Sequence, residues 1–512
     1  MIDFLIVLLY FIIIFFTALS GSKLNKSITS DEYFLSGRSL KWPSIALSTI
    51  ATNVQGYQFL GMMGSAYLFG LAQANLEINA MQGLLIAAFV FVPVFLKSRI
   101  TTITEFVRIK LGKNIALCYS LVSICLFSTI TLGAALFWGA YAADMVFGDI
   151  LGFISHDQII RISLLIIVLG VFSAVYTYLG GLSAVVKTDI IQFFVLVFGG
   201  IVVLFVTISH LGGWDQLFIQ TPEKMHLHLS ANHEKLPWIH MFGLFFLNIN
   251  YWCANQTVMQ RAIAARSLKH AQTGLMVGGV LKYFMAVIII IPGIALYGIM
   301  DQPLSDPDMA FPYIVNNYIP IGLKGFILCG LFASLMSTVD STFNSIATLW
   351  SIDIYSVYIN KNANEYEKVN SGRKAIIYSF FTATFMGLVL LYLKFENSNG
   401  AFTHNLNELR YYINAGIVVL ICSSIIIVKP NHKYILFGFL VTFPLNFLIQ
   451  NFLPEINYFI RAFIVIVVGL SISLYNSSLV KFKDLFYSYS IQNSYIGILL
   501  LISLVLIHIV FH

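Results

Sequence analysis

Residues 4–19 read FLIVLLYFIIIFFTAL, a run that carries no charged side chain. Its length is close to the roughly 20 residues with which an α-helix crosses the ~30 Å hydrocarbon core of a bilayer. Comparable apolar runs occupy residues 162–178 and 496–511. Because backbone groups find no water inside the hydrocarbon, only α-helices or closed β-barrels can cross it. The sequence lacks the alternating ten-residue pattern of barrel strands, so these runs predict membrane-spanning helices.

The composition of the whole chain agrees with these runs. Of 512 residues, 58% are hydrophobic and 10% are charged, whereas soluble domains carry about 25% charged residues. This excludes an ordinary soluble globule, and we expect no appended catalytic domain such as a membrane kinase would need. The first run has neither a basic start nor a small-residue cleavage site, so we expect a retained helix and not a signal peptide.

Hydropathy predicts about fourteen membrane spans, as in a multi-pass protein of the cell membrane. The spans centre near residues 11, 56, 84, 130, 170, 197, 250, 285, 340, 383, 418, 441, 465 and 501. With that count, every linker rich in Lys and Arg falls on one side of the membrane. These linkers hold Lys23, Lys26, Arg38, Lys41; Lys97, Arg99, Arg108, Lys110, Lys113; Arg261, Arg266, Lys269; Lys361, Lys368, Arg373, Lys374; Lys429, Lys433; and Lys481, Lys483. The positive-inside rule assigns that side to the cytoplasm and places both termini outside it.

Four ionisable residues lie within or at the ends of the predicted spans: Glu77, Asp189, Lys282 and Asp340. A charge at membrane depth costs about 2.5–3.5 kcal/mol on insertion scales, so such residues mark functional sites by default. The alternative for each is pairing with a neighbour or reaching to the membrane interface. The sequence leaves both readings open.

Two predicted spans are interrupted by polar residues. One reads ATNVQGYQ at residues 51–58, and the other reads NINYWCANQ at residues 248–256. Five spans separate them, and interrupted helices at matching positions of two repeats indicate a transporter site at the membrane midplane. Unwound turns release carbonyls that can bind a cation, while amides and helix ends face the solute. The alternative is that the polar stripes only hold helices together.

The ninth predicted span carries a stripe of hydroxyl groups. Ser334, Ser337, Thr338 and Ser341 follow i, i+3, i+4, i+7 spacing and share one helix face. Hydroxyl and carbonyl oxygens suit a hard cation such as Na⁺. Alternatively, these side chains bond the carbonyls one turn back in their own helix.

At these residues the sequence resembles the sodium:solute symporter family, most closely its sodium/galactose and sodium/glucose transporting branch. The resemblance runs from the first linker to about residue 355. Its motifs are DEYFLSGR (31–38), QFLGM (58–62), GS (64–65), GGLSAV (180–185), TDIIQ (188–192), YW (251–252), NQ (255–256), QR (260–261), AARS (264–267), MST (336–338), NS (344–345) and DIY (353–355).

The resemblance implies an all-α integral membrane fold with a LeuT-type core of five plus five inverted-repeat helices. We expect an extra N-terminal span and cytoplasmic loop at residues 1–42. The transport core would occupy residues 43–428, and accessory C-terminal spans residues 429–512.

The resemblance also assigns site residues. The common sodium site maps onto the backbones of Ala51, Val54 and Ser334 and the hydroxyls of Ser337 and Thr338. The sugar site maps onto Gln58, Glu77, Asn248, Tyr251 and Lys282, with Asn407 where relatives have Gln. We also expect a second sodium site at Asp189, Asp340, Ser341 and Ser337, the alternative being that Asp340 is protonated or paired structurally.

Three positions depart from the sugar-transporting relatives. Tyr57 stands where they have an acid, Leu76 where they have an aromatic outer-gate residue, and Lys187 where an aromatic precedes the TD motif. These departures concern the outer gate and the identity of the sugar.

The predicted function is sodium-coupled symport of a sugar, such as galactose or glucose, by alternating access. Retention of both Glu77 and Lys282 favours a sugar over an amino acid, and inositol, sialic acid or an amino acid are the alternative solutes. A non-transporting sensor on the same fold is a further alternative. We expect Na⁺ as the coupling ion, a small solute and the lipid bilayer as partners, no nucleic acid and no enzymatic activity, since no catalytic constellation is present.

Overall fold

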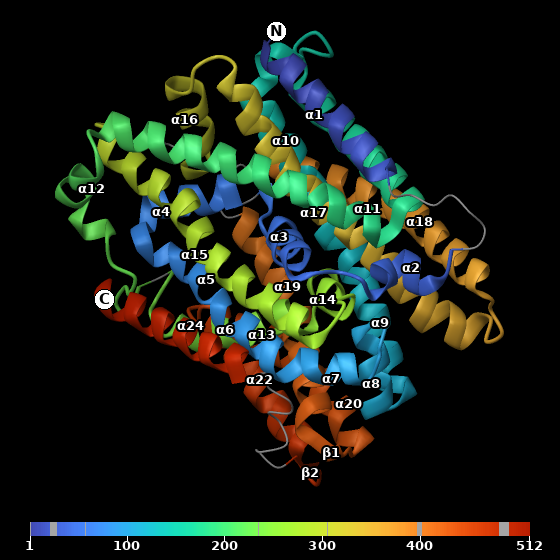
Figure 1. The fold of residues 1–512 in the computed structure, drawn as a ribbon. Coiled ribbons are helices and arrows are strands. Elements are labelled where there is room, and N and C mark those ends of the chain that lie inside the picture. The colour runs from blue at the N-terminus through green and yellow to red at the C-terminus, as the bar shows by residue number, and fades with distance from the viewer. Residues whose placement is uncertain are drawn as a thin grey trace.

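The computed structural model describes residues 2–20, 28–56, 58–233, 235–304, 306–396, 402–480 and 491–512, without the side chains of 149–150, 402–407 and 491–492. Within these residues the chain is a bundle of helices with one two-stranded antiparallel sheet (Figure 1). The helices of the first half are α1 (Ile2–Leu19), α2 (Ser30–Leu35), α3 (Trp42–Asn53), α4 (Met63–Phe69), α5 (Asn75–Ile78), α6 (Ala80–Ile86), α7 (Val92–Lys97), α8 (Ile103–Leu111), α9 (Lys113–Leu126), α10 (Leu132–Leu151), α11 (Gln158–Leu211), α12 (Trp214–Gln220), α13 (His240–Ile249) and α14 (Gln256–Ile263).

The second half continues the helical pattern. Its elements are α15 (Leu268–Ile299), α16 (Ala310–Tyr318), α17 (Leu323–Thr348), α18 (Glu365–Glu396), α19 (Phe402–Ile426), β1 (Ile427–Lys429), α20 (His432–Leu440), α21 (Thr442–Phe452), α22 (Tyr458–Leu474), β2 (Ser478–Leu479) and α24 (Ile491–Val510). Short 3₁₀ segments lie at Ser36–Arg38, Gly70–Ala74, Pro222–Lys224 and Pro307–Met309, and π-helical turns lie at Gln58–Met62, Ala87–Phe91, Phe127–Thr131, Asn250–Ala254 and Leu349–Ile359.

Ten helices among the described residues are long and apolar enough to cross a membrane. The prediction of membrane-spanning helices is therefore confirmed, whereas the count of about fourteen is not. The count differs partly because interrupted helices are short: α3 has 12 residues and α13 has 10, below the roughly 20 that a full crossing requires. Twelve of the fourteen predicted centres nevertheless lie in helical segments, while residue 56 falls in the break after α3 and residue 441 between α20 and α21.

Helix α11 is too long for a single crossing. Its 54 residues would extend about 80 Å at 1.5 Å per residue, more than twice the ~30 Å hydrocarbon core. Gly181 interrupts it with a φ of 56°, a conformation that side chains with a Cβ rarely adopt. A Cβ at this position would also lie 2.4 Å from the carbonyl oxygen of Tyr33 in α2. The chain therefore turns at Gly181, and α2 packs into the bend.

Helix α17 forms the centre of the bundle. In Leu323–Ile359, 94% of the most apolar window is buried inside the protein, against 22% for α1 and 17% for α24. Asp3 at the start of α1 explains how the outer helix is attached, because its Oδ1 accepts from the backbone N–H groups of Gly322 (2.9 Å) and Gly325 (2.6 Å). This carboxylate satisfies free donors at the N-terminus of α17 and complements its helix dipole.

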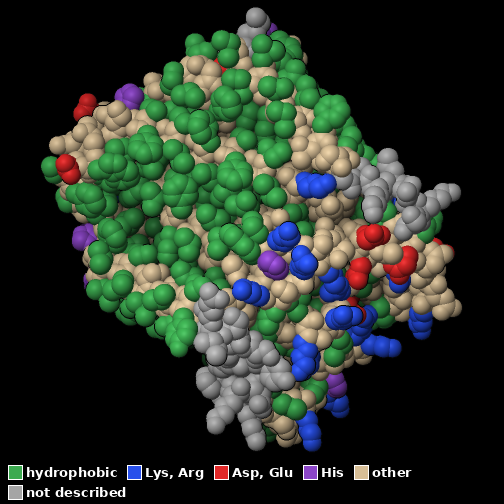
Figure 2. Space-filling model, viewed as in Figure 1, with side chains coloured by type: hydrophobic (Ala, Val, Ile, Leu, Met, Phe, Trp, Pro, Cys, Tyr) green, Lys and Arg blue, Asp and Glu red, His purple; other side chains and the backbone are tan. Residues whose placement is uncertain are grey.

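The two ends of the bundle differ in charge. Lys and Arg side chains gather at the end where Figure 1 shows α2, α8, α20 and β1, while hydrophobic side chains cover a broad area beside them (Figure 2). Both termini lie away from this basic end. The start of α1 contacts Gly322, and at the other terminus the N–H of Leu227 donates to the carbonyl of Phe511 at 2.8 Å.

Candidate functional site

The first polar patch interrupts a helix, as predicted from the sequence. Helix α3 ends at Asn53, and Val54 adopts an extended backbone with φ −75° and ψ 105°. The chain then turns sharply, because the amide N–H of Gln55 donates to the side-chain Oε1 of Gln58 at 2.7 Å. The helix resumes at Gln58 as a π-helical turn that leads into α4. The last carbonyls of α3 are therefore released from the helical pattern.

The second polar patch interrupts a helix as well. Helix α13 passes into the π-helical turn Asn250–Ala254, and Asn255 is extended with φ −86° and ψ 116°. The side chain of Asn255 then caps α14 by accepting from the N–H of Thr257 at 2.9 Å. Here a released carbonyl is already bound, because the hydroxyl of Tyr119 donates to Ala254 O at 2.6 Å.

The residues assigned to the common sodium site lie in α3, directly after it, and in α17, and these two helices are in contact. Ala51, Val54, Ser334, Ser337 and Thr338 are all buried. Their backbones and side chains offer carbonyl and hydroxyl oxygens with no formal charge. This donor set suits a hard monovalent cation.

Hydrogen bonds join the two sides of this contact. The hydroxyl of Thr338 donates to Thr52 O across the contact at 3.0 Å, and to Ser334 O within its own helix at 3.2 Å. The Ser334 Oγ atom is buried without a hydrogen-bond partner among the described residues. The hydroxyls of the stripe therefore bond both within α17 and across to the broken helix.

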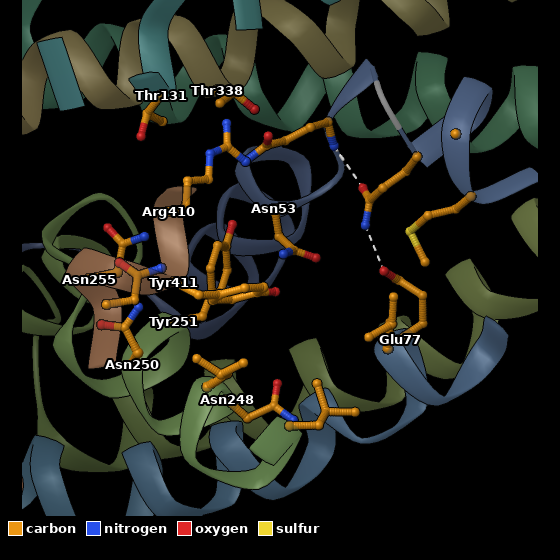
Figure 3. A pocket seen from close by; sticks show the side chains of 18 of the residues that line it. Asn53, Glu77, Thr131, Asn248, Asn250, Tyr251, Asn255, Thr338, Arg410 and Tyr411 are labelled. Atoms are coloured by element: carbon orange, nitrogen blue, oxygen red, sulfur yellow. Dashed lines mark hydrogen bonds between the residues drawn. The ribbon is translucent and has the colours of Figure 1, made fainter. Parts of the chain in front are cut away.

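A cavity of about 420 Å³ lies beside the first break and is lined by Asn53, Gln58 and also Thr338. All five residues of the predicted sugar site with described side chains line it, namely Gln58, Glu77, Asn248, Tyr251 and Lys282. Figure 3 shows Glu77, Asn248 and Tyr251 around this space. The side chain of Asn407 lies outside the described residues, as does Tyr57. The volume falls in the range of small-molecule sites.

The two charged residues of this cavity, Glu77 and Lys282, bond to each other and to polar side chains around them. Glu77 and Lys282 form an ion pair with side chains 4% and 1% exposed. Gln58 donates to Glu77 Oε1 at 2.6 Å (Figure 3), and Lys282 donates to Asn53 Oδ1 at 2.5 Å. Such a chain of donors and acceptors matches the hydroxyl groups of a polar solute, which both donate and accept.

Arg261 is a buried residue whose role differs from the prediction. It was expected in a basic linker on the cytoplasmic side, but it is 0% exposed. Its Nη2 lies 3.1 Å from Asp189 Oδ2 and 2.8 Å from Thr52 Oγ1, and it also donates to Ser341 and to the carbonyl of Thr257. Hydropathy cannot distinguish a linker cation from one buried beside an acid, because only the tertiary packing supplies Asp189.

The residues expected at a second sodium site are divided between two environments. Asp189 accepts from Ser337 at 2.5 Å, from Ser48 and from Arg261, with Ser341 beside it. Asp340 instead accepts from the hydroxyl of Tyr176 and from the N–H of Ser341 at 2.8 Å.

Further cavity residues were missed by the sequence analysis. From α19 these are Arg410, Tyr411 and Asn414, and from α3 the residue is Asn53. Asn53 lies in the first polar patch and could have been chosen for that reason. Arg410 is an ionisable residue near the predicted span at 418, so the criterion that selected Glu77 would have found it.

Comparisons with known proteins agree with this geometry. The profile of the Sodium:solute symporter family matches residues 33–441. A sodium/glucose cotransporter of Vibrio parahaemolyticus is 30% identical over 483 residues, which cover 88% of this chain and 86% of that protein. The uncharacterized symporter YidK of Escherichia coli K12 is 34% identical over 72% of this chain and 65% of its own length.

Two solved structures share the fold. The structure of a Na⁺-coupled sialic acid symporter in its substrate-bound outward-open state has a TM-score of 0.79 at 19% identity, covering 92% of this chain and 97% of that chain. MHP1, a nucleobase-cation-symport-1 family transporter, has a TM-score of 0.56 at 14% identity over 93% of this chain and 98% of that one. The chain thus has the all-helical, LeuT-like fold of these transporters.

Proposed function

The chain belongs to the sodium:solute symporter family, and from this premise we propose that it takes up a sugar of hexose size, such as galactose or glucose, by sodium-coupled symport. One observation carries this proposal. The segment around the break after Asn53 contacts the hydroxyl stripe of α17 and also lines the cavity that holds Glu77 and Lys282, and Thr338 of the stripe lines this cavity as well. A cation and a solute bound there would share one short stretch of backbone.

The shared backbone supplies the coupling. We propose that Na⁺ binds the carbonyls of Ala51, Val54 and Ser334 and the hydroxyls of Ser337 and Thr338. Binding would order the turn that holds Asn53 and Gln58, both of which bond the charged pair of the cavity. Sodium then raises the affinity for the solute, and by linkage the solute raises the affinity for sodium by the same factor.

The sugar is favoured by the chemistry of the cavity. Glu77, Lys282, Gln58, Asn248 and the later position Asn407 are the proposed polar partners of the solute hydroxyls, and Tyr251 offers a ring for the apolar face of a sugar. A site that bonds hydroxyl groups rejects analogues that lack one, because its own buried groups would stay unpaired. Inositol, sialic acid and amino acids are the alternative solutes, and a sensor on the same fold is the alternative to transport.

Whether Asp340 binds an ion distinguishes symport with two sodium ions per solute from symport with one. A second sodium ion would need Asp189, Asp340 and Ser341 to face one ion. The contacts of Asp189 with Arg261 and of Asp340 with Tyr176 support the alternative, in which both carboxylates are paired within the protein. We propose one sodium ion per solute, and two ions counted per solute in proteoliposomes would overturn this part.

The proposed membrane topology has about fourteen spans, a core of five plus five helices and both termini outside the cytoplasm. The basic end of the bundle supports this orientation, because cytoplasmic linkers of membrane proteins are enriched in Lys and Arg (Figure 2). Cysteine labelling from each side of the membrane tests it.

Uptake of labelled sugars into proteoliposomes tests the function. An inward sodium gradient should drive uptake of a sugar above its equilibrium level, and a potassium gradient should not. Failure with every sugar and with inositol, together with sodium-driven uptake of an amino acid, would overturn the sugar assignment and leave the coupling intact.

A further inference from the structure

Two histidines far apart in the sequence are joined to the segment that carries Glu77. His508 lies near the end of α24, which packs against α6 (Figure 1), and His228 lies in the linker between α12 and α13. Nε2 of His228 is 3.1 Å from Nδ1 of His508, and the two rings are stacked with their centroids 5.1 Å apart. Nε2 of His508 is in turn 3.3 Å from Oδ1 of buried Asn79. The three side chains therefore form one hydrogen-bonded row from the linker to the end of α5.

This row continues into the wall of the solute cavity. Asn248, which lines the cavity from α13, donates from its side-chain amide to Asn79 O at 3.0 Å. Asn75 attaches the linker a second time, because its side-chain amide donates to Leu227 O at 2.6 Å. Glu77 lies between Asn75 and Asn79 in the chain. The linker and α24 therefore hold the segment that carries Glu77 and bonds Asn248.

The partners of the row define which ring nitrogens carry hydrogens. The side-chain amide of Asn79 donates to Asn75 O at 3.0 Å, so its Oδ1 is the acceptor. Gln82 donates to this oxygen at 2.7 Å, and His508 faces it with Nε2, which must carry a hydrogen. In the neutral ring Nδ1 is then an acceptor for Nε2–H of His228. The neutral pair thus makes both of its hydrogen bonds.

An added proton does not fit this arrangement. Only one hydrogen can lie between the two rings, and Nε2 of His508 already carries one. A third hydrogen must therefore go to Nδ1 of His228, which is buried without a hydrogen-bond partner among the described residues. A buried N–H without an acceptor is costly, and the pair would also carry a charge. The row is therefore complete only while both histidines are neutral.

The titratable groups around His228 do not favour a proton on it. Lys224 of the same linker, with Glu223 as its charged neighbour, donates instead to a backbone carbonyl of α4 at 2.6 Å. The carboxylate of Glu77 is paired with Lys282. Burial and a neighbouring imidazole lower the pKa of His228. The other titratable side chains around it, within the part of the chain that the structure describes, are those of His226, His240, His508 and His512.

We infer that His228 and His508 are positioning residues of the solute site, and that their neutral pair holds the segment around Asn79 in place. The inference rests on the proposed function, because it takes the solute to bind at Glu77 and Asn248. Acidification should weaken solute binding without any change in the groups that touch the solute. In the proposed topology the pair lies outside the cytoplasm, so the external pH would act on it.

Solute binding to the purified full-length protein at saturating sodium tests the inference. The probes are labelled galactose and glucose, titrated at pH 7.5 and at pH 5.5. The wild-type affinity should fall about fivefold on acidification, at the lower end of usual couplings between linked sites. H228Q should bind as the wild type does at pH 7.5 and lose most of this fall, because its amide can donate to His508 or accept from it and does not titrate. H156Q, which changes an exposed histidine between α10 and α11, should keep the full fall.

A second variant separates positioning from a general structural role. H508F removes the donor to Asn79, so hexose affinity should be about fivefold weaker than in the wild type at pH 7.5. It should also no longer depend on pH. The sodium-dependent thermal shift, measured without solute, should stay as in the wild type. If H508F does not fold, the comparison of the wild type with H228Q decides.

The outcomes separate this inference from the proposed function. A wild-type affinity that does not change with pH, or that falls equally in H228Q, would overturn the role of the histidine pair and leave sodium–sugar symport standing. Binding of neither sugar in sodium at pH 7.5 would overturn the proposed function itself. Thermal stability without solute then decides on the pair. It should fall on acidification in the wild type and less in H228Q, and equal falls would overturn the pair as well.

Discussion

The break after Asn53 and the break at Asn255 both interrupt a helix with polar residues, yet their released carbonyls meet different surroundings. At the second break, Tyr119 donates to Ala254 O, and Asn255 caps the next helix with its own side chain. At the first break, the end of α3 faces the hydroxyl stripe of α17, and Ser334 Oγ is buried without a hydrogen bond among the described residues. At each break one carbonyl accepts a hydroxyl, Ala254 O from Tyr119 and Thr52 O from Thr338, but the first break also faces a row of hydroxyl groups, which we propose as ligands for an ion.

This difference indicates that an interrupted helix is not by itself a binding site. What distinguishes the two breaks is the neighbouring helix. A tyrosine donor from α9 satisfies one, and a row of small hydroxyl residues on α17 faces the other. The following variants test this distinction, beginning with the largest expected effect.

Removal of Arg261 should cost the most stability, because this residue ties both breaks together. It contacts Thr52 before the first break and Thr257 after the second, and it pairs with buried Asp189. R261M would leave an uncompensated buried carboxylate, which costs about 3–5 kcal/mol. Denaturation in detergent measures the loss. The double variant R261M/D189N should recover part of it, and an R261M protein as stable as wild type would contradict the account.

Loss of the α17 hydroxyls should weaken sodium binding selectively. S337A and T338V each remove one proposed ligand, and we expect sodium affinity to fall about tenfold, or roughly 1.4 kcal/mol. Solute affinity at saturating sodium should change by much less. Sodium titration of the thermal shift measures this effect. An unchanged sodium affinity in both variants would remove the first break as the ion site.

The matched change at the second break should affect stability and not sodium. Y119F removes the donor to Ala254 O and leaves that carbonyl buried, at a cost of about 1 kcal/mol. Its sodium titration should match that of the wild type. If Y119F weakened sodium binding as much as T338V, the two breaks would not differ in the way described.

The smallest expected effect concerns pH at the segment before α16, which lines the cavity. Burial, with the negative charge of Asp306 nearby, raises the pKa of Asp308 to about 6. As pH rises from 5 to 7, Asp308 gains its charge, and the added negative potential should strengthen apparent sodium binding by less than about threefold. The folded protein should lose a little stability over the same rise, because the protonated form is the one it favours. D308N should abolish the pH dependence of sodium binding. A D308N variant with the same pH profile as the wild type would refute Asp308 as its cause.

Much of the fold could be predicted because the bilayer imposes strong constraints on sequence. Apolar runs gave the helices, and the polar patches at 51–58 and 248–256 gave both breaks. The attachment of α1 through Asp3 could not be predicted, since its partners at Gly322 and Gly325 lie over 300 residues away. The residues of the candidate site likewise include some that the sequence predicted and some that it did not. Glu77 and Lys282 were predicted as ionisable residues within spans, and Gln58 followed from a family resemblance. The burial of Arg261 depends on contacts that only the folded chain reveals.

The reciprocal effect of sodium and solute on each other's binding tests the central claim most directly. We expect sodium to raise solute affinity, and the solute to raise sodium affinity by the same factor, in the wild type and in Y119F. In T338V both factors should fall together toward one. Solute binding that is equally tight in sodium and in potassium would contradict the claim that the first break joins the two sites.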